Sequence, residues 1–160
     1  TTARNMNDLS EHTQDLTEVI SLMAEGLDPS EKAAVDKAIF KVYKQAKTEM
    51  PLLRDLYSEL HKLGHLPLCE RLEKYISGSL SGVFNEQTNV NLDNRLVVFD
   101  IKDMPESLRQ IMMMIIANFV QNEVKVRPQK RMLIIDEGWL LLEHEQSARF
   151  VTGLVRGARK

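Results

Sequence analysis

The sequence lacks the features that would predict disulfide bonds or a membrane-spanning helix. Its 160 residues contain one cysteine, Cys69, which excludes an internal disulfide and suits a reducing compartment. No uninterrupted apolar run approaches the ~20 residues that a membrane-spanning helix needs. A net charge of −2 gives no sign that the chain as a whole binds nucleic acid. The length allows one domain, or a domain with an appendage.

Residues 8–76 predict four short amphipathic helices. Gly26 ends the first, and Asp28-Pro29-Ser30-Glu31 begins the second, because aspartate can cap, proline fits the first turn and the glutamate completes a capping box. The third runs over residues 51–64 and the fourth follows Pro67. Apolar residues recur at helical spacing in each of them. The pattern indicates a small helical bundle.

One spacing in this block resembles that of a metal site. His61, His65 and Cys69 lie four residues apart, which on an unbroken helix would align three soft ligands. Gly64 and Pro67 interrupt the helix between them, and no fourth ligand is evident. We therefore expect surface histidines and a small buried thiol instead of a zinc site.

The composition changes after the helices. Residues 77–94 are rich in serine, glycine and asparagine and indicate a connector, with short β pieces around 83–84 and 90–92. This change predicts an all-helical subdomain over residues 1–79 and a second domain over residues 80–160.

A strand–helix–strand pattern then appears. Residues 95–101 and 132–135 are apolar runs typical of strands buried on both faces. Between them, Asp103 and Pro105 open a helix that continues to Val124 and is apolar over most of its circumference. The order predicts a right-handed βαβ unit with two parallel strands, and hence an α/β fold.

The second apolar run ends at two adjacent carboxylates, Asp136 and Glu137, followed by Gly138. Open α/β sheets bind ligands at the carboxyl ends of their strands. This is the layout of a Walker B element, in which the first acid orients Mg²⁺ through its water shell and the second polarises the attacking water. The simpler alternative is a core strand that ends in solvated acids.

The charge is unevenly distributed along the chain. Residues 1–40 hold eight acids and three bases, whereas residues 121–160 hold five acids and eight bases. A last helix, predicted over residues 146–160, ends in Arg156, Arg159 and Lys160, which could lie at an interface or sense a phosphate. The alternatives are a solvated face and a helix C-terminus that attracts cations.

A resemblance to a known family rests on several of these segments. The strings MLIIDEGWLLLE and FVTGLVRGARK resemble the Walker B strand and following helix of TraC/VirB-type ATPases of type IV secretion and conjugation. RLVVFDIKDMPESLRQ, the LDPSEK turn and the connector glycines Gly78 and Gly82 are also similar. The resemblance covers nearly the whole chain. It implies part of a RecA-like P-loop NTPase core of the FtsK/HerA branch, with an all-helical insertion.

The resemblance also implies roles and partners. Asp136 matches the magnesium-associated acid and Glu137 the catalytic glutamate, with ATP and Mg²⁺ as cofactors. It further implies a hexameric ring, contacts with other secretion-system components and a cytoplasmic location, peripheral at the cytoplasmic face of the inner membrane. Arg156–Lys160 matches a basic family motif.

The sequence departs from the family in lacking a phosphate loop. No G-x-x-x-x-G-K-[ST] motif is present, and neither is the glutamine motif expected beyond the last helix. We therefore expect an internal piece of a motor that hydrolyses ATP as a full protein and is inactive alone. Two alternatives stay open: a DNA-pumping translocase of the FtsK/HerA type, and a non-enzymatic helical adaptor.

Overall fold

A computed structural model describes residues 6–46, 50–87, 94–126 and 132–142, together with Ala148, Val151, Thr152 and Val155. The chain divides into two compact units, residues 1–94 and residues 95–160, which are described separately below as the helical unit and the second unit. Within the described ranges, no helix is both long enough and apolar enough to cross a membrane.

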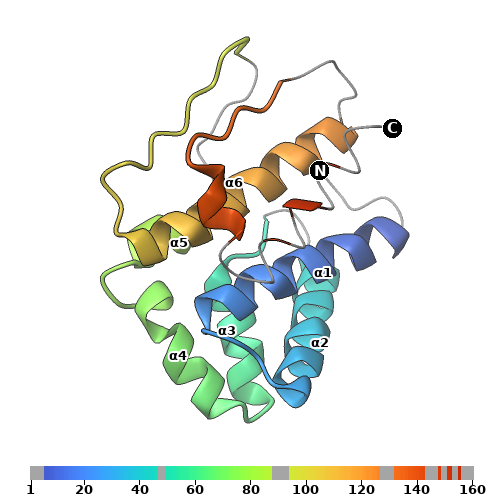
Figure 1. The fold of residues 1–160 in the computed structure, drawn as a ribbon. Helices are drawn as coiled ribbons and strands as arrows, with labels where there is room; N and C mark the ends of the chain where they lie inside the picture. The colour runs from blue at the N-terminus through green and yellow to red at the C-terminus, as the bar shows by residue number, and fades with distance from the viewer. Residues whose placement is uncertain are drawn as a thin grey trace. The chain divides into compact units, whose positions relative to one another are not determined.

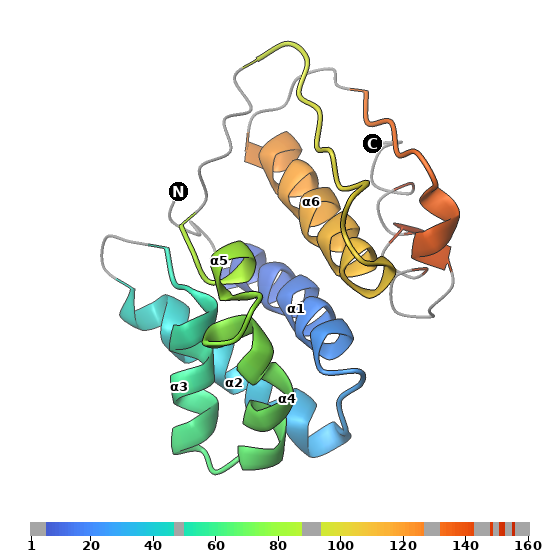
Figure 2. The same ribbon diagram turned by 90° about the vertical axis from the view of Figure 1, so that its left-hand side faces the viewer.

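The helical unit contains the four predicted helices and one short addition. They are α1 (Met6–Met23), α2 (Pro29–Gln45), α3 (Leu53–Lys62), α4 (Leu66–Ile76) and α5 (Ser81–Phe84) (Figure 1). Each helix packs on the next along the chain, and α3 and α4 lie side by side as a hairpin (Figure 2). The predicted bundle of four helices is confirmed.

Each helix of the bundle buries the apolar positions that helical spacing predicts, because residues three and four apart share a face. Leu60, Leu68 and Leu72 are fully inaccessible to solvent. The other large buried side chains of this unit are Val19, Ile20, Met23, Val35, Ile39, Val42, Leu56 and Tyr75. Residues 6–76 therefore contain a core of their own.

The turn between α1 and α2 has well-defined ends. The N–H of Gly26 donates to the carbonyl of Ser21 (2.8 Å) and the N–H of Glu25 to that of Leu22 (3.2 Å), which is the Schellman pattern. The capping box predicted at the start of α2 is confirmed. Asp28 Oδ1 accepts from the N–H of Glu31 (2.8 Å), and Glu31 Oε2 accepts from the N–H of Asp28 (3.0 Å).

The connector differs from the prediction. Val83 and Phe84 belong to α5, so the β piece expected there is wrong, and residues 90–92 lie outside the described residues. The Phe84 ring packs edge-on against Tyr75, with 5.2 Å between ring centroids. The Asn85 side chain accepts a hydrogen bond from a backbone N–H of α3 (3.0 Å) and donates one to the last carbonyl of α4 (3.2 Å). These contacts to α3 and α4 stabilise a helical turn that the local composition does not indicate.

The second unit is organised around α6 (Glu106–Val126), the predicted crossover helix, and a short 3₁₀ helix, η1 (Gly138–Leu142). Residues 95–101 and 132–135 have no regular secondary structure, so neither run forms a β-strand in the described part of the unit. The described residues therefore do not show the predicted parallel pair or the βαβ core, while the P-loop fold class is taken up below. A strand needs a neighbour to pair its N–H and C=O groups, and an isolated pair of strands is only marginally stable.

A small core joins the parts of the second unit. Met113 of α6 and Leu141 of η1 are buried together, and Ile101 and Val151 pack against them. Residue Val151 belongs to the predicted last helix, whose described residues are helical. The cluster thus fixes the end of the first apolar run and η1 against α6.

Candidate functional site

The two candidate catalytic acids form the turn between residues 132–135 and η1. Asp136 and Glu137 are both exposed. The N–H of Glu137 donates to Asp136 Oδ1 over 2.9 Å, a bond between neighbours that shapes the turn. The turn therefore presents two adjacent carboxylates at the end of an apolar segment.

The backbone of Glu137 adopts an unusual conformation. Its φ of 52° lies in the left-handed region, which costs a residue with a side chain about 1–2 kcal/mol. Among the described non-glycine residues only Glu25, at the end of α1, shares this feature. Gly138 would adopt such a conformation at lower cost, yet the chain places Glu137 there. Conformations of this kind cluster at functional sites, where the surrounding structure maintains them.

The helix that follows anchors the acidic turn. In a 3₁₀ helix residues three apart share a face, so Leu141 lies on the face of Gly138, and Leu142 on the face of Trp139. Leu141 is buried against Met113, whereas Trp139 and Leu142 are exposed. The apolar contact of Leu141 therefore sets the position of the acids relative to α6.

Asp100 lies near the end of the other apolar run, residues 95–101, and no contact among the described residues joins it to these acids. Asp100 is exposed, and its Oδ1 accepts a hydrogen bond from the N–H of Lys102 (3.1 Å), which is a local turn leading toward α6. Arg156, Arg159 and Lys160 lie outside the described residues.

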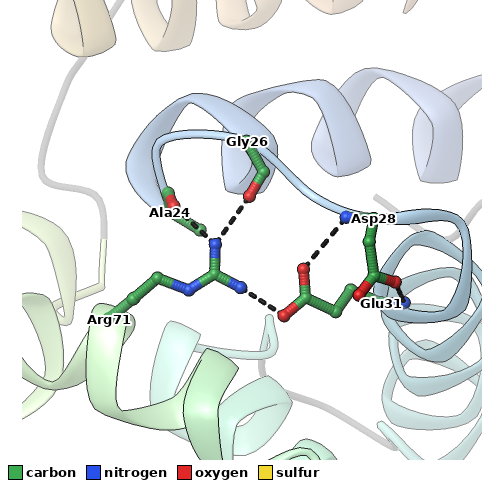
Figure 3. A network of polar contacts seen from close by, with 5 residues as sticks. All are labelled: Ala24, Gly26, Asp28, Glu31 and Arg71. Atoms are coloured by element: carbon green, nitrogen blue, oxygen red, sulfur yellow. Dashed lines mark hydrogen bonds and ion pairs between the residues drawn. The ribbon is translucent and has the colours of Figure 1, made fainter.

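The sequence analysis missed one arginine that organises the helical unit. Arg71 of α4 donates through Nη1 to the carbonyls of Ala24 and Gly26, both at 2.8 Å, and its Nη2 pairs with the Glu31 carboxylate (Figure 3). The same carboxylate closes the capping box with Asp28. Arg71 thus ties α4 to the turn between α1 and α2. Because its partners lie 40 to 47 residues away in the sequence, no local pattern could identify it.

The ionisable groups of the helical unit are used in packing. Tyr57 Oη donates to Glu73 Oε2 over 2.5 Å, and this bond raises the pKa of Tyr57 to about 12. A hydrogen bond from Ser77, followed by the one from Tyr57, lowers the pKa of the Glu73 carboxyl. Burial raises the pKa of the Cys69 thiol.

In the ranges that the structure describes, no group of three or more His, Cys, Asp or Glu side chains is placed to hold a metal ion.

Comparison with known proteins gives the class of this chain. The model of the TraG P-loop domain matches residues 66–160, and the chain belongs to that family of P-loop NTPase domains. The matched region contains α4, α5 and the whole second unit.

Two relatives make the assignment more specific. The type IV secretion system protein virB4 of Bartonella quintana (strain Toulouse) is 31% identical over 94 residues, which cover 56% of this chain and 12% of that protein. The solved structure of VirB4 of Thermoanaerobacter pseudethanolicus shares the fold, with a TM-score of 0.80 and 24% identity over 95% of this chain and 66% of that one. The resemblance to TraC/VirB-type ATPases is confirmed. The chain spans only part of both relatives.

Proposed function

We propose that this chain is part of the motor domain of an ATPase that energises type IV secretion or conjugative transfer. In this proposal Asp136 and Glu137 are its Walker B acids. The observation that carries the proposal is the turn at these residues, which presents two exposed carboxylates directly after an apolar segment in a P-loop domain. The left-handed backbone of Glu137 supports it, because a strained glutamate at this point has no evident packing role.

The two carboxylates fit a magnesium–nucleotide complex. Mg²⁺ prefers oxygen ligands and keeps several of its waters, and it is held in nucleotide sites by one or two carboxylates together with substrate phosphates. Bound Mg²⁺–ATP supplies the phosphoryl group that is transferred to water. Asp136 would hold the cation through its water shell, and Glu137 would hold one water and take up its proton.

The phosphates need a cradle that these 160 residues do not encode, since they contain no phosphate loop. We therefore expect hydrolysis from a longer protein that carries that loop, and none from residues 1–160 alone. In that protein we further propose a ring of subunits at the cytoplasmic face of the membrane. Arg159 and Lys160 would have a structural or interface role, and the helical unit would dock other secretion components.

The decisive experiment uses the longer protein. Glu137→Gln keeps the size of the side chain but removes its basicity, so ATP hydrolysis should fall by about 10²–10⁴ while Mg²⁺–ATP binding is retained. Asp136→Asn should instead weaken the magnesium-dependent part of binding. Asp100→Asn, an acid in the local turn before α6, is the matched control and should change the rate little. Hydrolysis by Glu137→Gln at the wild-type rate would contradict the proposal.

A further inference from the structure

The outer side of α2 carries lysines around one aromatic residue. Its inner side packs in the bundle and consists of the buried residues Val35, Ala38, Ile39 and Val42. Residues three, four and seven positions apart share one face of a helix, and on the outer side these are Lys37, Phe40, Lys41 and Lys44. All four side chains are exposed, that of Phe40 by 41%. The bundle therefore leaves this face of α2 accessible.

A lysine from α3 joins this face through a buried carboxylate. Glu59 pairs with Lys41 Nζ at 2.5 Å and with Lys62 Nζ at 2.6 Å. The Glu59 side chain is buried, whereas both lysine side chains are more than half exposed. An ammonium group has more N–H donors than one such pair uses, so each lysine can still donate to a ligand. Glu59 thus holds two cationic groups in place, which lowers the entropy that a ligand must give up to order them.

We name the residues Lys37, Phe40, Lys41, Lys44 and Lys62 the basic face. Its four lysines outnumber the two carboxylates beside it, which belong to Glu59 and to Asp36, one helical turn from Phe40. Among the described residues, neither Lys37 nor Lys44 pairs with an acid. The whole chain has a net charge of −2, so the positive charge is local to this face. Charge complementarity calls for a partner that carries negative groups.

The side chains of the basic face favour a protein over nucleic acid or a membrane. The face contains no arginine, the residue that recognises phosphate through two parallel hydrogen bonds. It offers one aromatic ring, whereas proteins that bind single-stranded nucleic acid stack successive bases on several. The apolar side of α2, which a membrane-surface helix would insert among lipids, is already buried in the bundle.

We propose that the basic face docks an acidic amphipathic helix of another secretion-system protein, whose carboxylates pair with the lysines and whose apolar side chains contact Phe40. Residues 37–44 span about 10 Å, or two helical turns, which matches two turns of the partner helix. The inference rests on the docking role proposed above for the helical unit and not on Asp136 or Glu137. Its test needs no ATP, so its failure can be distinguished from a failure of the motor proposal.

The first test measures binding of the 160-residue chain to a synthetic helical peptide in which Glu and Leu recur at helical spacing. A second peptide has Gln in place of every Glu and should bind at least about tenfold more weakly. Lys37→Glu and Lys44→Glu should each weaken binding of the acidic peptide by about five- to tenfold, because each replaces an attraction by a repulsion. Thermal unfolding of each variant should be close to that of the wild type, since neither lysine pairs within the bundle.

Arg54→Glu is the matched control. It makes the same change of charge on α3, five residues from Glu59 and so on a different side of that helix. It should leave binding of the acidic peptide within about twofold of the wild type. Equal losses for Arg54→Glu and Lys44→Glu would overturn the proposal, because only the overall charge would then matter. Equal binding of the two peptides, or none, would also overturn it.

The contribution of Phe40 can be separated from that of the charges. Phe40→Ala should weaken binding of the acidic peptide by about three- to tenfold and leave its dependence on salt unchanged, because the lysines remain. An unchanged affinity would contradict the apolar contact that the proposal assigns to Phe40.

The last test locates the bound peptide and compares it with other anionic ligands. In a titration followed by NMR, the acidic peptide should shift the backbone amides of residues 37–44 and of Lys62. Shifts confined to other residues would overturn the proposal. Tighter binding of a DNA oligonucleotide, or of vesicles that contain phosphatidylserine, at residues 37–44 would overturn it as well, since the face would then serve a nucleic acid or a membrane.

Discussion

The helical unit and the second unit differ in how much of their structure is completed by their own residues. In the helical unit each of α1–α4 buries its apolar face against a helix close to it in the sequence. In the second unit α6 has a small core, but four apolar side chains outside it are more than three-quarters exposed: Leu96, Val98, Met132 and Ile134. Helical hydrogen bonds form within one segment, whereas a sheet depends on neighbours from distant parts of the chain.

Polar groups show the same contrast. Arg71 reaches three oxygen acceptors in the helical unit. On α6, Asn118 is buried, and neither Nδ2 nor Oδ1 of its amide has a hydrogen-bond partner in the part of the chain that the structure describes. An unsatisfied buried amide costs about 1–3 kcal/mol. Among the described residues, the long-range donor of the helical unit is thus satisfied, whereas α6 holds a buried amide that is not.

The largest expected effect compares one apolar truncation in each unit. Leu60→Ala should reduce the unfolding free energy of the helical unit by about 2–5 kcal/mol, because Leu60 is completely buried. Ile134→Ala in the same 160-residue chain should change stability by less than about 0.5 kcal/mol, as surface substitutions do. Urea denaturation followed by helical circular dichroism measures both. Equal effects would remove the contrast between the units.

A smaller effect tests the long-range tie in the helical unit. Arg71→Met removes the hydrogen bonds to Ala24 and Gly26 and the ion pair with Glu31, and should destabilise the unit by about 1–3 kcal/mol. Arg71→Lys should recover only part of this, since one ammonium group cannot span the same acceptors. Arg54→Met, at an exposed arginine of α3, is the control. Indistinguishable unfolding midpoints for Arg71→Met and Arg54→Met would show that the tie contributes nothing.

The parts of the structure that the sequence predicted are those that depend on local contacts. The helices and the capping box of Asp28 and Glu31 depend on residues a few positions apart, so the sequence predicted them. The contacts of Arg71 and the helical turn α5 depend on distant partners and could not be predicted. The position of Asp136 and Glu137 after an apolar run was predictable, whereas the left-handed backbone of Glu137 was not. The β-strands were predicted from residues that have the pattern for a sheet but no pairing neighbour among the residues that the structure describes.

The smallest expected effect is a dependence on pH in the helical unit. The buried Glu59 carboxylate pairs with Lys41 (2.5 Å) and Lys62 (2.6 Å), and the hydrogen bond from Lys41, followed by that from Lys62, lowers its pKa. A lowered folded-state pKa gives a stability contribution that is complete above the ordinary value of 4.5 and is lost as pH falls through the folded-state value. We expect a loss of up to about 1 kcal/mol.

Thermal unfolding between neutral pH and pH 3 measures this loss. Glu59→Gln, which cannot titrate, should remove that part of the acid dependence while leaving the contributions of the other carboxylates. Identical acid dependence in the wild type and in Glu59→Gln would show that the two lysine pairs add no stability.

Amide hydrogen exchange of the 160-residue chain tests the contrast between the two units most directly, because it reports the stability of each segment separately. We predict that the amides inside α3 and α4 exchange more than about 10³-fold slower than unstructured peptides, since they open only when the bundle unfolds. Amides of residues 96–101 and 132–135 should be protected less than about tenfold, and should gain protection in the longer protein that carries the phosphate loop. Protection of those two segments equal to that of α3 and α4 in the 160-residue chain would contradict the conclusion that the second unit is incomplete.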